Sequence, residues 1–330
     1  MHKVSLGTAC LLFSILSLHA QSPLEKGLQS INRTSAEAIV EFLADDELQG
    51  REAGMHGSRV AARYIVSRLK QDGIRPLDEN SYYQSFEACS KERQQRRRWQ
   101  VHPDSVAILK QGTHRSLKMN NVLAYIPGRR SDEYVIIGAH FDHLGVDETL
   151  ANDKIYNGAD DNASGVSAVL QIAHAFILSG QKPLRNVIFA FWDGEEKGLL
   201  GSKYFVQHCP FLKQVKSYLN FDMIGRNNKP ERPQHVVYFY TAAHPVFGDW
   251  LKQDIVRYNL QLQPDYRSWD NPVSGSDNAS FALSDIPIIW YHPDYHQPSD
   301  HAASLNWEKI VEITKASFLN AWNLANESNY

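Results

Sequence analysis

The chain has 330 residues, enough for one large or two modest domains with a substantial core. Apolar residues make up 43% and charged residues 22%, as in an ordinary soluble globular protein. The formal net charge of −3 argues against a nucleic-acid-binding protein, which is normally basic. A basic run at residues 93–98 is the local exception, and we interpret it as a solvated loop or edge. The sequence leaves open whether Cys89 and Cys209 pair.

The N-terminus has the pattern of an export signal. A short basic start, Met1-His2-Lys3, precedes the apolar run Val4–Leu18, and Leu18-His19-Ala20 forms a plausible cleavage site. Cys10 within this run raises the alternative of a lipid-anchored start, which we disfavour because the leucine expected three residues earlier is missing. We expect residues 1–20 to be a signal peptide. The protein would then be exported, periplasmic or secreted, with no stable membrane insertion after cleavage.

The first part of the remaining chain predicts helices and then a less regular stretch. An amphipathic helix is expected at Ala36–Ala44, with Ser35 as its N-cap. A second is expected at Ser58–Gln71, ending before Gly73. Residues 82–118 are polar, basic and aromatic, and we interpret them as edge strands or an insertion.

From residue 119 onward, short β-branched runs alternate with helical patterns. Strands are expected at Asn121–Ile126, Glu133–Gly138, Asn186–Trp192, Ser217–Asp222, His235–Tyr240 and Ile286–Tyr291. Helices are expected at Ser164–Ser179, Gly201–His208, Pro245–Tyr258, Asp277–Leu283 and Trp307–Ala325. Strands that are apolar on both faces and alternate with helices predict an α/β three-layer sandwich. Its central sheet would be mixed and largely parallel, with helices on both sides. We expect residues 21–330 to form one domain.

Acidic and histidine side chains follow several of these strands directly. Glu195 and Glu196 come just after the run Val187–Trp192, where unpaired charge beside a core is costly. His140 and Asp142 follow a second strand, and Asp222 follows a third. Each of these residues taken alone is better explained as a strand-end, capping or hydrogen-bonding residue. Because the carboxyl ends of parallel strands form one edge of a sheet, we expect them to meet.

Asp161 and His296 complete a set of potential metal ligands. Histidine and carboxylate ligands without thiolates suit zinc, or another divalent metal, in a catalytic site. The three carboxylates of Asp161, Glu196 and Asp222, with a bridging hydroxide, would balance two dications. Glu195 is then a spare carboxylate that can take a proton from the attacking water. Asp160 and Asn162 are assigned to loop geometry. His143, His292 and His301 are interpreted as surface or hydrogen-bonded histidines.

Five segments resemble peptidase family M28, which contains secreted bacterial aminopeptidases with two zinc ions. They are Gly138–Asp142, Asn157–Gly165, Phe191–Glu196, Asn220–Gly225 and Tyr295–Pro298, in the order found in the family. The resemblance extends from about residue 36 to the C-terminus. One departure is Asn278, where relatives often have histidine.

The resemblance implies a role for each candidate residue. His140 and Asp222 would bind one zinc, Glu196 and His296 the other, and Asp161 would bridge them. Glu195 would be the general acid/base, Asp142 would orient His140, and Tyr295 would donate a hydrogen bond to the developing oxyanion.

The activity expected from this resemblance is removal of N-terminal residues from peptide substrates by a metal-bridging water. One alternative is a glutaminyl cyclase, which has the same fold and usually a single zinc. Another is a carboxypeptidase or other amidohydrolase on this scaffold. The third is a non-catalytic binding module. The oligomeric state is not predicted by the sequence.

Overall fold

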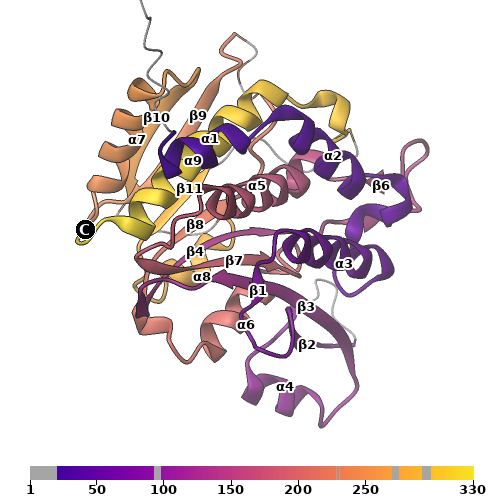
Figure 1. Cartoon of the computed structure of the whole chain (residues 1–330). Coiled ribbons are helices and arrows are strands. Elements are labelled where there is room, and N and C mark those ends of the chain that lie inside the picture. Colours follow the sequence, from indigo (N-terminus) through magenta and orange to yellow (C-terminus); the bar gives the residue numbers. More distant parts are fainter. Residues whose placement is uncertain (1–20, 93–97, 228, 230, 270–274, 292–298) are drawn as a thin grey trace, which may run out of the picture.

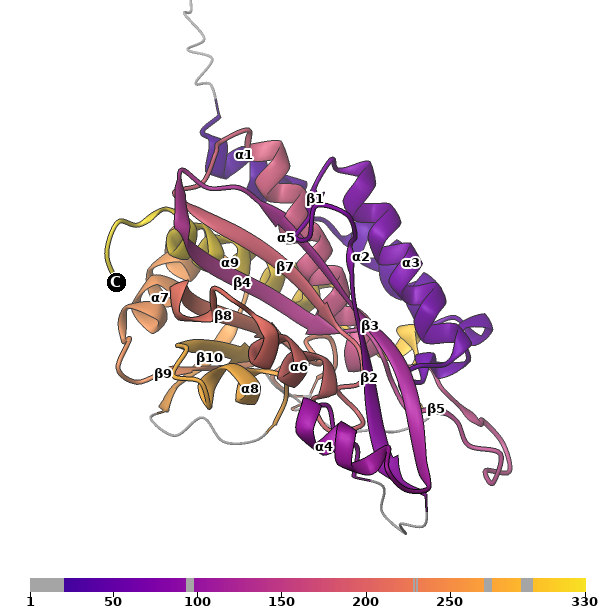
Figure 2. The ribbon, with the colours of Figure 1, turned by 90° about the horizontal axis from the view of Figure 1, so that it is seen from below.

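A mixed β-sheet crosses the centre of the computed structural model, with helices on both faces (Figures 1 and 2). The structure describes residues 21–330 except 93–97, 228, 230, 270–274 and 292–298. The expected signal peptide therefore lies outside the described residues. The predicted α/β sandwich with a mixed sheet is confirmed.

The described strands of the main sheet lie in the order β1-β3-β7-β4-β8-β11-β9-β10, and β2 pairs with β3 beside β1. The central strands β7, β4, β8 and β11 run parallel, whereas β1, β2 and β3 form an antiparallel side and β9 is antiparallel to β11. The strands are β1 (Arg75–Pro76), β2 (Tyr83–Lys91), β3 (His114–Ile126), β4 (Arg130–His140), β7 (Arg185–Trp192), β8 (Val215–Phe221), β9 (His235–Thr241), β10 (Gln263–Trp269) and β11 (Ile288–Tyr291). A separate hairpin pairs β5 (Gly145–Val146) with β6 (Ile155–Tyr156).

The central strands are apolar on both faces because helices cover both. Side chains alternate along a strand, so Val135 and Ile137 of β4 enter one core cluster while Ile136 enters the other. The same division places Phe189 of β7 in the larger cluster and Ile188 in the smaller one. This is the burial expected of parallel strands in a three-layer protein.

The larger core lies beneath α5 and α9, which contact β4 and β7, and α1 and α2 pack over α5 (Figure 1). On the other face α6 contacts β3 and β7, and α8 contacts β8 and β11. The helices are α1 (Pro23–Ser30), α2 (Arg33–Leu43), α3 (His56–Gln71), α4 (Pro103–Leu109), α5 (Gly165–Ser179), α6 (Leu200–His208), α7 (Val246–Arg257), α8 (Asn278–Ala282) and α9 (Trp307–Asn326). The short helical turns are η1 (Asp46–Arg51), η2 (Ala159–Ser164), η3 (Leu212–Gln214) and η4 (Ala302–Ser304).

Among the described residues, one helical stretch, Ala159–Ser179, is long and apolar enough to cross a membrane by length and composition. It contains α5, and 83% of its apolar window is buried inside the protein. Such burial is also found in the core helix of a soluble protein.

Several local expectations differ from the structure at element ends. α2 begins at Arg33 because the side chain of Asn32, rather than Ser35, accepts the capping hydrogen bond, from the backbone N–H of Ser35 at 2.9 Å. The expectation of edge strands or an insertion at residues 82–118 is confirmed in part: β2 pairs with β3 at the side of the sheet, and the segment also contains α4 and the first part of β3. Cys89 and Cys209 are both free thiols.

Replacement of Phe189 tests the packing of the larger core. Its side chain is fully buried and lies edge-on to the ring of Phe176, 6.3 Å between centroids. Phe189→Ala is expected to lower the free energy of unfolding by about 3–5 kcal/mol, because it leaves a cavity in a close-packed core. Urea denaturation measures the change, with Val256→Ala as the control because Val256 is 80% exposed. Equal stability of the two variants would contradict this assignment of the core.

Candidate metal centre

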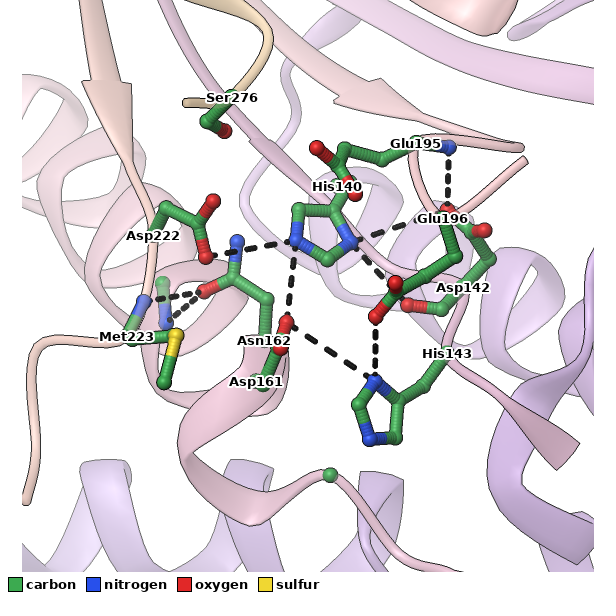
Figure 3. Close-up of polar contacts among 12 residues, drawn as sticks. His140, Asp142, His143, Asp161, Asn162, Glu195, Glu196, Asp222, Met223 and Ser276 are labelled. Carbon is green, nitrogen blue, oxygen red and sulfur yellow. Dashed lines mark hydrogen bonds and ion pairs between the residues drawn. The ribbon is translucent and has the colours of Figure 1, made fainter. Parts of the chain in front are cut away.

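The candidate residues gather at the carboxyl ends of three neighbouring parallel strands (Figure 3). His140 is the last residue of β4 and is level with Trp192, the last residue of β7. Glu195 and Glu196 follow β7, and Asp222 follows β8. Ligands of open α/β sheets bind at this edge, because loops converge there on a rigid support.

The first group of side chains consists of His140, Asp161 and Asp222, all buried. The Nε2 atom of His140 lies 3.2 Å from Oδ1 of Asp161 and 3.4 Å from Oδ1 of Asp222. Three potential ligand atoms therefore face one point between β4, β8 and the loop that leads into α5.

The second group shares Asp161 with the first and adds His143 and Glu196. The Nδ1 atom of His143 lies 2.7 Å from Oε1 of Glu196 and 3.9 Å from Oδ1 of Asp161. The same oxygen of Asp161 therefore faces both histidines. This is the arrangement that a bridging carboxylate requires.

The donor atoms fit a small divalent cation. Ligand atoms of a tetrahedral zinc lie about 2.0–2.1 Å from the metal, and hence about 3.3–3.4 Å from one another. The two distances around Nε2 of His140 are close to that value. Oδ1 of Asp222 is also buried and has no hydrogen-bond partner among the described residues. A buried carboxylate oxygen in that state is costly unless a cation compensates it. The structure thus contains buried histidine and carboxylate groups compatible with a metal site.

Asp142 contacts the opposite nitrogen of His140 and also the segment that carries Glu195. Nδ1 of His140 lies 3.1 Å from the backbone oxygen of Asp142 and 3.7 Å from its carboxylate Oδ1. The backbone N–H of Glu195 donates to Oδ1 of Asp142 at 3.0 Å. Asp142 therefore holds the imidazole ring mainly through its backbone oxygen and the backbone at Glu195 through its carboxylate.

The carboxylates of the site dominate its electrostatics. Burial alone would lower the pKa of His140, but Asp222 and Glu195, with hydrogen bonds to Asp142 and Asp161, hold that pKa well above 6.5. Burial raises the pKa of Glu195 well above 4.5; His140 opposes this shift, whereas Asp222 and Glu196 add to it. This concentration of negative charge favours a bound cation.

The loop that carries Asp161 is held by the residues on either side of it. The carboxylate of Asp160 accepts hydrogen bonds from the backbone N–H groups of Gly225 and Arg226, just after Asp222. The Asn162 side chain donates to the backbone oxygen of Phe221 at 2.8 Å and accepts from the N–H of Met223 at 3.3 Å. These two side chains therefore join the Asp161 loop to the Asp222 segment.

Asp300 holds the same loop from the other side. Its carboxylate accepts the backbone N–H groups of both Asp160, at 3.0 Å, and Asp161, at 2.9 Å. Sequence reasoning did not identify Asp300, which lies four residues after His296. Only its position after a predicted ligand could have drawn attention to it.

His143 is the clearest site residue that sequence reasoning missed. Of the two alternatives that the sequence leaves for it, surface or hydrogen-bonded, the second holds: the side chain is fully buried and hydrogen-bonded to Glu196. Its spacing of three residues from His140, across Asp142, was the available signal. His301 forms the more ordinary contact, an exposed pair with Asp153 at 2.8 Å.

Three of the residues named from sequence, Tyr295, His296 and His292, lie outside the described residues. The roles inferred for Tyr295 and His296 therefore stay predictions. Tyr266 lies on β10 and stacks on Tyr238.

Comparison with known proteins identifies the family of this chain. The model of peptidase family M28 matches residues 121–320, which contain His140, Asp161, Glu196 and Asp222. Leupeptin-inactivating enzyme 1 of Streptomyces exfoliatus is 37% identical over 173 residues, 51% of this chain. That match spans only 34% of the relative's own length.

Solved structures show the same fold at low sequence identity. A zinc aminopeptidase from Bacillus subtilis superposes with a TM-score of 0.67 at 13% identity, covering 91% of this chain and 97% of that one. A glutaminyl cyclase from Macrostomum lignano superposes with a TM-score of 0.65 at 18% identity, covering 97% and 96%. The fold alone therefore does not separate these two activities.

His143 provides a test of the second group. His143→Ala removes the hydrogen bond to Glu196 and is expected to weaken binding of one zinc ion by about 10- to 100-fold, as loss of a residue that orients a ligand does. Competition with a chelator measures the affinity. His301→Ala is the control, because it removes an exposed histidine from its pair with Asp153. Unchanged zinc affinity in His143→Ala would show that this histidine does not support the site.

Proposed function

The chain belongs to peptidase family M28, and from that premise we propose that it is a metal-dependent aminopeptidase. One observation carries the proposal. Two groups of potential ligands share the carboxylate of Asp161, and a further carboxylate, Glu195, follows β7 beside them. Two-metal sites recur in aminopeptidases, and these two groups are the residues that would hold such a pair.

We assign the metal-binding roles as follows. His140 and Asp222 would hold one zinc ion, Glu196 and His296 the other, and Asp161 would contact both. Burial of His140 at 1% exposure and of Asp161 at 4% supports this assignment, because such groups need a charged partner. His143 would lie next to the second ion through its contact with Glu196. Zinc is preferred because all the proposed ligands are imidazole or carboxylate groups.

Bound zinc would polarise the substrate carbonyl and lower the pKa of the attacking water. The protein's own contribution is to place Glu195. Its backbone is fixed by Asp142, and its carboxylate lies among the ligands without belonging to either group. Glu195 would accept a proton from the attacking water and return it to the leaving amine.

Recognition of a free N-terminus fits the charge of the site. A peptide α-amine is cationic near neutral pH, and the strand ends present several carboxylates within a small volume. An N-blocked peptide lacks that charge. The proposal is therefore specific to aminopeptidase rather than general amidase activity.

Substrate selectivity separates the proposal from its alternatives. The protein is expected to hydrolyse aminoacyl peptides, to leave N-blocked peptides largely intact, and to contain about two zinc ions per chain. Chromatographic product analysis and elemental analysis of the purified protein measure these outcomes. Cyclisation of N-terminal glutaminyl peptides with about one zinc would instead identify a glutaminyl cyclase. Equal hydrolysis of blocked and free peptides would contradict the aminopeptidase assignment.

Glu195→Gln tests the general base. The variant keeps the shape of the side chain but cannot accept a proton, so kcat is expected to fall by about 10²- to 10⁴-fold. Zinc content should stay at the wild-type level, because Glu195 is not a proposed ligand. Glu41→Gln, an exposed substitution on α2, is the matched control. Near-wild-type turnover by Glu195→Gln would refute the role given to this residue.

A further inference from the structure

Arg51 is a fully buried cation in contact with the backbone of the candidate site. It is the last residue of η1, its side chain is 0% exposed, and its backbone has φ of +48°. Arginine is rarely buried to this extent unless its charge and its donors are satisfied. The surroundings of this guanidinium therefore call for a physical explanation.

All five N–H donors of the Arg51 guanidinium are matched by backbone oxygens. Nε donates to Phe141 at 2.8 Å, and Nη1 donates to Leu43 and, at 2.6 Å, to Asn157. Nη2 donates to Gly158 at 2.9 Å and to Asp161 at 3.4 Å. The rigid planar fork thus binds three separate stretches of backbone at once.

Two of these stretches carry the candidate ligands. Phe141 directly follows His140, and residues 157–161 form the segment that ends at Asp161. The backbone oxygen of Arg51 in turn accepts the N–H of His143 at 3.2 Å. Arg51 therefore contacts the backbone of both ligand-bearing loops, although it is not itself a candidate ligand.

The backbone at Gly158 is closely packed against Arg51 and the Asp161 loop. Gly158 has φ of +61°, and a Cβ atom there would lie 2.1 Å from the backbone oxygen of Asp161 and 2.8 Å from Nη2 of Arg51. The same Cβ would lie 2.6 Å from Cδ2 of His143. The glycine lets the backbone approach the guanidinium closely enough for the hydrogen bonds to form.

The five acceptors of Arg51 are neutral carbonyl groups, so they do not balance its positive charge. Carboxylates beyond these hydrogen bonds balance it instead. Burial lowers the pKa of Arg51 to about 10, and the carboxylates of Asp161, Asp300, Asp142 and Glu196 act against that shift. The guanidinium is therefore still charged at neutral pH. Its charge opposes a second cation nearby, whereas its hydrogen bonds fix the loops that bind one, so the two effects on metal affinity have opposite signs.

We propose that Arg51 is a positioning residue whose five hydrogen bonds hold the loops of His140 and Asp161 in the geometry that binds metal. The inference rests on the proposed metal-dependent function. It extends that function to a residue that touches neither metal nor substrate. The hydrogen-bonding effect outweighs the charge effect, because loss of the fork releases two ligand-bearing loops together.

A second buried arginine in the same protein supplies a matched control. Arg185 is 3% exposed and also donates to backbone oxygens, those of Leu324, Glu327 and Ser328. It begins β7, whereas the candidate site lies beyond the other end of that strand. Its replacement tests what a buried arginine contributes to folding without touching the site.

The experiment compares Arg51→Lys, Arg51→Gln and Arg185→Lys in the full chain, by zinc affinity from chelator competition. Both Arg51 variants are expected to bind zinc about 10- to 100-fold more weakly than Arg185→Lys, and excess zinc should restore part of their activity. In the zinc-free protein, amide hydrogen exchange should speed up at residues 157–164 in the Arg51 variants only. Lysine keeps the positive charge but not the planar guanidinium with its five donors, whereas glutamine keeps neither.

Two results would overturn the inference. The first is equal zinc affinity and equal exchange in Arg51→Lys and Arg185→Lys, which would make Arg51 a folding residue only. The second is tighter zinc binding by Arg51→Gln, which would show that charge repulsion dominates. If an Arg51 variant does not fold, Gly158→Ala disturbs the same contact with Arg51 retained. It should weaken zinc binding as well, and wild-type affinity in Gly158→Ala would count against the inference.

Failure of the proposed function gives a different result. A wild-type protein that binds zinc but does not hydrolyse aminoacyl peptides would refute the aminopeptidase assignment. Weaker zinc binding by the Arg51 variants would still support the positioning role in that case.

Discussion

The accumulation of buried carboxylates at one edge of the sheet is the constraint on which the rest of the site depends. Asp142, Asp161, Glu196 and Asp222 all lie within a few residues of a strand end or of the turn into α5, and Glu195 lies beside them. Like charges in a poorly solvated region repel one another strongly. Such a cluster is stable only when cations and hydrogen-bond donors compensate it. Each supporting interaction around the site supplies one or the other.

Backbone amides compensate two further buried carboxylates beside this cluster. The carboxylates of Asp160 and Asp300 each accept two backbone N–H groups, and in doing so they fix the chain on both sides of Asp161. On the opposite side, Arg51 donates to backbone oxygens of the same loop. The loop is therefore held through its main chain, which leaves the Asp161 side chain available to the two histidines. Some polar groups hold the main chain of the loop, and others contact the Asp161 side chain. Many polar groups are therefore buried near this one candidate ligand.

The sheet brings residues that are distant in the sequence together at one site. The ends of β4, β7 and β8 are in register, so residues more than fifty positions apart in the chain come within hydrogen-bonding distance. Helices on both faces make these strands rigid and exclude water from them. The result is a fixed support for loops that carry charge, as expected for sites in open α/β proteins.

The sequence by itself determined the class of fold and most of the potential ligands. Apolar runs followed at once by His140, Glu195 and Asp222 predicted both the strands and the edge at which these residues meet, because parallel strands end together. The sequence did not predict the strand β10. Its residues Gln263–Trp269 lack a clear alternation of apolar and polar side chains, as is common for strands at the edge of a sheet.

Only the tertiary structure decided which other residues support the site. Arg51 carries no local pattern that separates it from ordinary loop residues, and His143 and Asp300 stand out only by lying a few residues from predicted ligands. Their importance comes from contacts with segments between 53 and 140 positions away. Periodicity records which face of a strand or helix is buried, and it therefore reports on neighbours within one element. Compensation of buried charge is set instead by atoms that meet only after the chain has folded.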